Sequence, residues 1–212
     1  MEGEITHALF GPVRADVREG VATTAADVPP QPILSAARGA RGWVFATRDV
    51  VYASPTFTGR LQILRSFACE HAVATADSER MLPTLHLGHE RVGITVAGEG
   101  AWWSDGATLQ EVGGADVVGI VWHDAAWGAR LDAYRSVRVT HDGGATWREV
   151  DLQGALPMVL HLRDDVVQVE TGGAPLRIDA RDVVSVAPRS AAATWDPVGD
   201  RCALSEANAH AL

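Results

Sequence analysis

Apolar residues in this chain come in short runs that are separated by turn-forming residues. Each run is rich in valine, isoleucine and aromatic residues and is bounded by glycine, aspartate, proline or serine. This pattern is typical of strands in an antiparallel all-β protein, and long amphipathic helical periodicity is absent. The runs that we expect to be strands are residues 42–48, 50–54, 60–64, 91–98, 117–123, 136–141, 158–162, 166–170 and 183–187.

Three segments depart from this pattern. Residues 22–32 contain Pro29, Pro30 and Pro32, and proline lacks the N–H that a central strand must donate, so this segment is expected to be a linker or an edge crossing. The best helix candidate is residues 66–76, which could equally be a strand with a loop. The last residues, 204–212, are expected to form a frayed tail or a short terminal helix.

An internal repeat organises the strands. The clearest copy is VRVTHDGGATWREV at residues 137–150, and a shortened copy, AWWSDGATLQEV, occupies residues 101–112. In each copy a strand runs into a turn rich in aspartate and glycine and then into a second strand. Weaker copies lie at residues 50–64, 167–178 and 184–198. Such self-similarity indicates a fold built from repeated β units.

The turn of the clearest copy, T-H-D-G-G-A-T-W, resembles the Asp-box of sialidase-type (BNR) repeats, Ser/Thr-x-Asp-x-Gly-x-Thr-Trp. In that family the box lies between the third and fourth strands of a β-propeller blade. The resemblance implies structural roles for Thr140, Asp142, Gly144, Thr146 and Trp147, and for Ser104, Asp105, Gly106 and Thr108 of the shortened copy. The residue types suit a turn, because aspartate accepts backbone N–H groups, glycine tolerates positive φ and tryptophan supplies apolar surface.

Chain length then limits the number of blades. At about 40 to 45 residues per four-stranded blade, 212 residues supply about five. We therefore expect a small β-propeller of about five antiparallel four-stranded sheets, in one domain over residues 1–200 with a tail at 201–212. A partial propeller or a β-sandwich is the alternative. The expected blades are residues 36–67, 68–112, 113–150 and 151–187, with a fifth formed by the strand at 5–10 pairing with the strand at 194–198.

Composition excludes several function classes. The formal charge is -9, from 18 basic and 27 acidic residues, and every basic residue is arginine. A nucleic-acid partner is therefore not expected, because such affinity comes from clustered positive charge. Without lysine there is neither a Schiff-base mechanism nor a Walker phosphate-binding loop. The start of the chain lacks a secretory-signal pattern and no run approaches the ~18 apolar residues of a membrane helix. We expect no membrane insertion and, by default, a cytoplasmic protein.

Few residues are candidates for metal or ligand binding. His86, His89 and Glu90 form a compact set of metal-type side chains, but residues three apart on a strand face opposite ways, so no metal site and no cofactor are expected. Cys69 and Cys202 are expected to be ordinary thiols, with a disulfide between them as the alternative. The adjacent Trp102 and Trp103 should point to opposite faces of a strand and be buried, unless one is exposed to stack on a sugar.

The Asp-box resemblance also raises a sialidase-like glycoside hydrolase as an alternative. Enzymes of that family use an arginine triad, a Tyr–Glu nucleophile pair and an acidic proton donor. This chain has only Tyr52 and Tyr134, and it lacks the Phe/Tyr-Arg-Ile-Pro motif. Tyr134, with Asp132 and Arg135 nearby, is the better suspect, and Arg135, Arg138 and Glu149 are not placed together by the sequence. We expect no catalytic residues and a non-enzymatic binding or scaffolding module with a protein or glycan ligand.

Overall fold

The computed structural model describes residues 5–67, 82–163 and 165–187, and within these ranges all regular structure is β-strand. The strands form five antiparallel sheets, which we number blades 1 to 5 in chain order. No helix in these ranges is long and apolar enough to cross a membrane. The all-β fold of five antiparallel, mostly four-stranded sheets that the sequence predicts is confirmed.

Within each blade every strand pairs with its neighbour in the chain. Blade 1 consists of β1 (Ile5–Phe10), β2 (Val13–Arg18) and β3 (Val21–Thr24). Blade 2 consists of β4 (Ser35–Gly39), β5 (Gly42–Ala46), β6 (Val50–Ser54) and β7 (Gln62–Ser66). Blade 3 consists of β8 (Thr84–His86), β9 (Val92–Val96), β10 (Gly100–Ser104) and β11 (Leu109–Gly113). Blade 4 consists of β12 (Val117–Trp122), β13 (Gly128–Asp132), β14 (Val137–Thr140) and β15 (Arg148–Glu149). Blade 5 consists of β16 (Pro157–Arg163), β17 (Val166–Thr171), β18 (Leu176–Ile178) and β19 (Val184–Val186).

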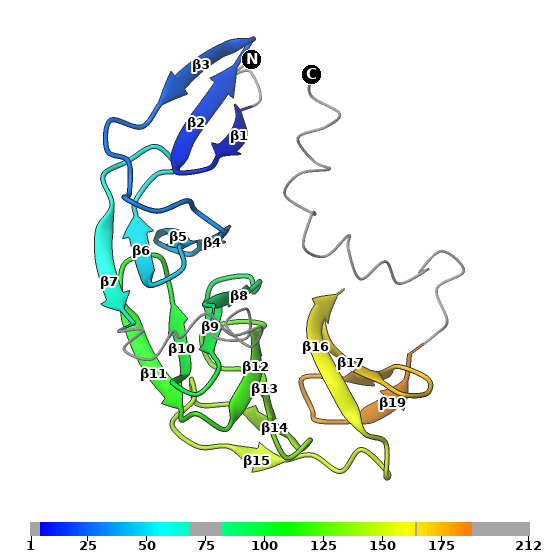
Figure 1. The fold of residues 1–212 in the computed structure, drawn as a ribbon. Helices are drawn as coiled ribbons and strands as arrows, with labels where there is room; N and C mark the ends of the chain where they lie inside the picture. Colours follow the sequence, from blue (N-terminus) through cyan, green and yellow to red (C-terminus); the bar gives the residue numbers. More distant parts are fainter. Residues whose placement is uncertain (1–4, 68–81, 164, 188–212) are drawn as a thin grey trace.

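The blades follow one another along an arc, as Figure 1 shows. The first strands of blades 2 to 5 approach one another on its inner side, where β8 contacts β4 and β12, and β12 contacts β16. Loops that follow these first strands are therefore brought close together although they are far apart in the sequence.

The hydrophobic core lies in layers between neighbouring blades. Successive residues of a strand point to opposite faces, so one strand can supply two layers. Trp102 and Trp103 on β10 do this: Trp102 packs with blade 2, and Trp103 packs with Trp122 of blade 4. Both are buried, with 2% and 9% of their surface exposed, so neither indole is available to stack on a sugar.

A buried arginine joins blade 1 to blade 2. Arg14 on β2 has no exposed surface, and its Nη1 donates to the carbonyl oxygens of Phe57 and Gly59 in the β6–β7 loop at 2.8 and 2.9 Å. Its Nη2 donates to Oδ1 of Asp27 at 2.6 Å. The other carboxylate oxygen of Asp27 accepts the N–H of Leu61 at 2.6 Å, so one ion pair ties both blades and their linker together.

Blades 2 to 5 match the ranges expected from the sequence to within one residue, at Ser35 and Gly113, but blade 1 differs from the expectation. Here β1 pairs with β2, and β2 pairs with β3. Neither β2 nor β3 is among the strands expected from the sequence. The segment expected to be a linker begins inside β3, whose four residues are all exposed. Residues 194–198, the expected partner of β1, lie outside the described residues. So do Cys69, Cys202, the tail at 201–212, most of the helix candidate at 66–76 and most of the repeat copy at 184–198.

The repeat copies do not all occupy the same place in a blade. The copies at residues 137–150, 101–112 and 50–64 each span the third strand, the turn and the fourth strand of their blade. The copy at residues 167–178 instead spans β17 and β18, which are the second and third strands of blade 5. Short apolar runs with a glycine turn occur at any hairpin, so this weak copy was not specific to one position.

Candidate functional site

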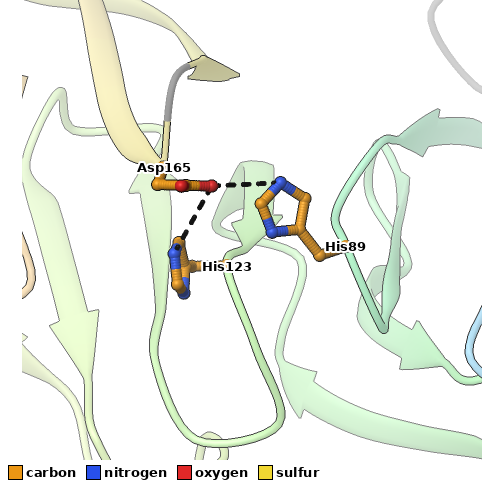
Figure 2. A group of neighbouring side chains, drawn as sticks. All are labelled: His89, His123 and Asp165. Atoms are coloured by element: carbon orange, nitrogen blue, oxygen red, sulfur yellow. Dashed lines mark ion pairs between the residues drawn. The ribbon is translucent and has the colours of Figure 1, made fainter.

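Three loops that each join the first and second strand of a blade meet on one side of the molecule. The β8–β9 loop of blade 3 carries His89, the β12–β13 loop of blade 4 carries His123, and the β16–β17 turn of blade 5 carries Asp165. Figure 2 shows the three side chains directed toward one another. We call them the His–Asp cluster. Because the first strands of these blades are neighbours, the fold places three distant sequence positions together.

Asp165 lies between the two imidazole rings. Its Oδ1 is 3.5 Å from Nε2 of His89 and 3.9 Å from Nε2 of His123. The centroids of the two rings are 5.3 Å apart. His89 and Asp165 are exposed and His123 is half-buried, so the cluster is open to solvent. Asp165 has a φ of 60°, a left-handed conformation that aspartate adopts more readily than most residues.

His123 is held in place by its own loop. Its Nδ1 lies 3.0 Å from Oδ2 of Asp124, and its ring packs edge-on against Trp127 at 5.2 Å between centroids. The other oxygen of Asp124 accepts the N–H groups of Ala126 and Trp127, both at 2.7 Å. The loop therefore fixes the carboxylate, and the carboxylate orients the imidazole.

His86, which the sequence groups with His89, has a different environment. It lies on β8, where its Nε2 is 2.8 Å from Oγ1 of Thr95 on β9. Burial, together with the nearby His161 on β16, lowers the pKa of His86 from 6.5 to about 4. His86 is therefore neutral near neutral pH, and only His89 of this pair belongs to the His–Asp cluster.

The first predicted Asp-box lies in the turn between β14 and β15, the third and fourth strands of blade 4. Asp142 accepts the N–H of Thr146 at 2.9 Å and its hydroxyl at 2.6 Å. The Thr140 hydroxyl donates to Asp142 at 2.7 Å and accepts the N–H of Gly144 at 2.9 Å. The hydrogen bonds to the Asp142 carboxylate lower its pKa from 3.8 to about 2, and the bond from the Thr146 hydroxyl has the largest effect. Trp147 is half-buried, and its ring lies 5.9 Å from that of Trp122.

The second predicted box, between β10 and β11, repeats this scheme with a shorter turn. Asp105 Oδ1 accepts the N–H groups of Ala107 and Thr108 at 2.9 and 2.8 Å, and the hydroxyl of Thr108 at 3.1 Å. The Ser104 hydroxyl accepts the N–H of Gly106 at 3.1 Å, as the Thr140 hydroxyl accepts that of Gly144. Burial alone would raise the pKa of Asp105, but these hydrogen bonds lower it below 3.8.

A third turn of this kind was missed by the sequence analysis. Between β18 and β19 of blade 5, Asp179 Oδ1 accepts the N–H groups of Arg181 and Val183 at 2.8 and 2.9 Å. The segment lacks the glycine, threonine and tryptophan of the box. The only available signal was an aspartate that follows one short apolar run and precedes another.

The residues considered for glycoside cleavage do not form a joint site. Tyr134 is 89% exposed in the β13–β14 turn, and Arg135 beside it has a φ of 62°. Asp132 is buried at the end of β13, where its two oxygens lie 3.1 Å from Nε of Arg130 and 3.2 Å from Nε of Arg138. Arg138 is also 3.9 Å from Glu149 on the neighbouring strand. Tyr52 is buried in blade 2, and burial raises the pKa of its hydroxyl above 10.

Comparison with known proteins gives a fold and no sequence family. No protein-family model matches the chain, and no curated protein matches it significantly in sequence. Solved structures that are similar to it include PorZ, an essential surface component of the type-IX secretion system of Porphyromonas gingivalis. This match has a TM-score of 0.59 and 13% identity, and covers 86% of this chain and 26% of PorZ.

Two other similar structures are YCF48 from Cyanidioschyzon merolae and the GH74 xyloglucanase from Xanthomonas campestris. YCF48 matches with a TM-score of 0.52 and 12% identity over 84% of this chain and 67% of that one. The xyloglucanase matches with a TM-score of 0.50 and 15% identity over 88% of this chain and 32% of that one. The chain thus spans about a quarter of PorZ and about a third of the xyloglucanase. At these identities the matches establish the β-propeller fold.

Proposed function

We propose that this chain is a non-enzymatic binding or scaffolding module of the Asp-box β-propeller type, with a protein or glycan ligand. Similar folds include both a secretion-system component and a xyloglucanase, so the fold does not choose between binding and catalysis. The choice between binding and catalysis therefore rests on which side chains are free to contact a ligand.

One observation carries the proposal: Asp132, the carboxylate nearest to Tyr134 in the sequence, is buried between Arg130 and Arg138. Glycoside cleavage needs a positioned acid together with a nucleophile or an activated water. An aspartate that is paired with two arginines in the protein interior cannot reach a sugar. Asp105 and Asp142 are likewise occupied by the hydrogen bonds of their turns.

The Asp-box assignment is part of the proposal. The turns at Asp105 and Asp142 both lie between the third and fourth strands of a blade, and both use the aspartate to accept N–H groups within the turn. The hydroxyl of Ser104, one residue before Asp105, accepts the N–H of Gly106. The hydroxyl of Thr140, two residues before Asp142, accepts the N–H of Gly144. This shared scheme supports a structural role for both boxes.

Charge and exposed surface bear on the ligand. The formal charge of -9 supports a ligand other than nucleic acid, because phosphate groups would be repelled. The β8–β9 loop presents Leu87, which is 68% exposed, two residues before His89. A single exposed apolar side chain does not distinguish a protein ligand from a glycan, so the proposal includes both.

Enzyme assays test this proposal directly. The full chain should show no turnover above buffer on fluorogenic sialosides or on a panel of aryl glycosides. The matched variant is Tyr134→Phe, which removes the exposed hydroxyl without changing the turn. Turnover by the wild-type chain that disappears in a folded Tyr134→Phe protein would replace the binding module with a sialidase-like hydrolase.

A further inference from the structure

The His–Asp cluster has the composition and spacing of a transition-metal site. Zn²⁺ binds histidine nitrogen and carboxylate oxygen at about 2.0 to 2.2 Å in tetrahedral geometry, which places neighbouring ligand atoms about 3.3 Å apart. The Asp165 oxygen lies 3.5 and 3.9 Å from the nitrogens of His89 and His123. All three ligand atoms lie within 4.8 Å of one another. Small rotations of exposed side chains would place all three around one ion.

We propose that His89, His123 and Asp165 bind one divalent transition-metal ion, and that Zn²⁺ is the ion the site fits. Two imidazoles and one carboxylate are ligands that suit zinc and its neighbours in the first transition row. Calcium and magnesium prefer sites made of oxygen atoms alone. The proposal is independent of the ligand proposed above for the propeller.

The surroundings of His123 support the proposal separately from the distances. Oδ2 of Asp124 lies 3.0 Å from Nδ1, and two backbone N–H groups hold Oδ1 of the same carboxylate. With the proton on Nδ1, the lone pair of Nε2 faces Asp165. A carboxylate that holds the outer nitrogen of a histidine is the usual partner of a metal-bound imidazole, because it fixes the tautomer and raises the basicity of the ligand.

A simple ion pair accounts less well for the same arrangement. Asp165 supplies one negative charge, whereas two protonated histidines with ring centroids 5.3 Å apart would repel each other. A metal ion uses both imidazoles in their neutral form and pairs its charge with Asp165. It therefore satisfies all three side chains at once.

Metal binding at this place would connect three blades. The ligands come from the hairpin loops of blades 3, 4 and 5, so one ion would hold together segments that are otherwise joined by packing between sheets. Three protein ligands leave a fourth position open. This position faces solvent, because His89 and Asp165 are exposed.

The test is a titration of the metal-free full chain with zinc chloride by isothermal calorimetry, with Co²⁺ absorption as a second measurement. We expect one ion per chain, a tetrahedral Co²⁺ spectrum and a higher melting temperature with zinc, since a ligand that binds only the folded state stabilises it. His89→Ala and Asp165→Ala should each raise the Kd at least about tenfold, and Asp124→Asn should raise it about 10- to 100-fold.

His141→Ala is the matched control. His141 is also an exposed histidine paired with an aspartate, since its Nε2 is 2.9 Å from Asp182, but it lies outside the cluster. Its loss should leave the Kd unchanged. The double variant His89→Ala/His123→Ala should lose the tetrahedral Co²⁺ spectrum. Absence of zinc binding to the wild-type chain, or equal affinity in the double variant, would overturn the proposal, and neither outcome bears on the glycosidase assays.

Discussion

The backbone of Gly106, in the turn between β10 and β11, packs directly against the backbone of Gly42 at the start of β5. A Cβ at position 106 would overlap the backbone atoms of Gly42, and Gly106 also has a φ of 93°. The neighbouring N–H of Arg41 donates to the carbonyl oxygen of Asp105 at 2.7 Å. The turn of blade 3 is thus seated on the β4–β5 hairpin of blade 2, with no room for a side chain between them.

This contact predicts that Gly106→Ala is more destabilising than an alanine at another positive-φ glycine. Gly98 is the matched control, because its φ is 80° and a Cβ there would have no neighbour within 4 Å. Gly98→Ala should cost about 1 kcal/mol from backbone conformation alone, and Gly106→Ala should cost that amount plus the overlap. Chemical denaturation of both variants measures the difference. Equal costs would show that the two hairpins separate easily.

The ion pair of Arg14 and Asp27 should be important for stability. Asp27→Ala leaves the buried guanidinium without its carboxylate, a change that typically costs about 3 to 5 kcal/mol. The control is Glu149→Ala, which removes an exposed partner 3.9 Å from Arg138 and should cost less than about 1 kcal/mol. Urea unfolding of the two variants would check this. Similar midpoints for both would mean that Arg14 is satisfied by carbonyl groups alone.

Acid should weaken the turn that contains Asp142. The folded-state pKa of Asp142 is about 2, below the ordinary 3.8, so the ionised carboxylate adds stability above pH 3.8 that is lost as the pH falls toward 2. Asp142→Asn should therefore melt below the wild type at pH 7, and the gap should shrink between pH 4 and pH 2. Thr146→Val, which removes a hydroxyl donor to this carboxylate, should show part of the same trend. A gap that is constant with pH would contradict the prediction.

Mild acid should act through His86. Its folded-state pKa is about 4, below the ordinary 6.5, so the folded protein disfavours the charged ring. The associated stability is complete above pH 6.5 and is lost as the pH falls from 6.5 toward 4. His86→Gln, which cannot gain this proton, should lose less melting temperature than the wild type between pH 7.5 and pH 5. Parallel melting curves for the two proteins would contradict this assignment.

The sequence by itself determined the class of fold and the position of most strands. Short apolar runs bounded by turn-forming residues reflect the preferences of each segment for strand or turn, which are a local property. The opposite directions of Trp102 and Trp103 follow from the side-chain period of a strand. The turn at Asp142 could also be predicted from the sequence, because its hydrogen bonds join residues within one short segment.

Blade 1 was harder to predict from the sequence, because the partners that allow a charged residue of β2 to be buried are distant in the sequence. The strand β2 alternates apolar residues with Arg14, Asp16 and Arg18, so it lacks the continuous apolar run by which the other strands are recognised. Arg14 is nevertheless buried, since carbonyl groups of the β6–β7 loop and the carboxylate of Asp27 satisfy it. Those partners exist only once blade 2 has packed against blade 1.

Only the tertiary structure could bring together the His–Asp cluster. His89, His123 and Asp165 occupy loops of three different blades, and neither spacing nor local pattern links them. Their approach depends on the contacts of β12 with β8 and β16. The short-range periodicity of the chain specifies each hairpin, whereas the packing of one sheet on the next decides which loops share a site.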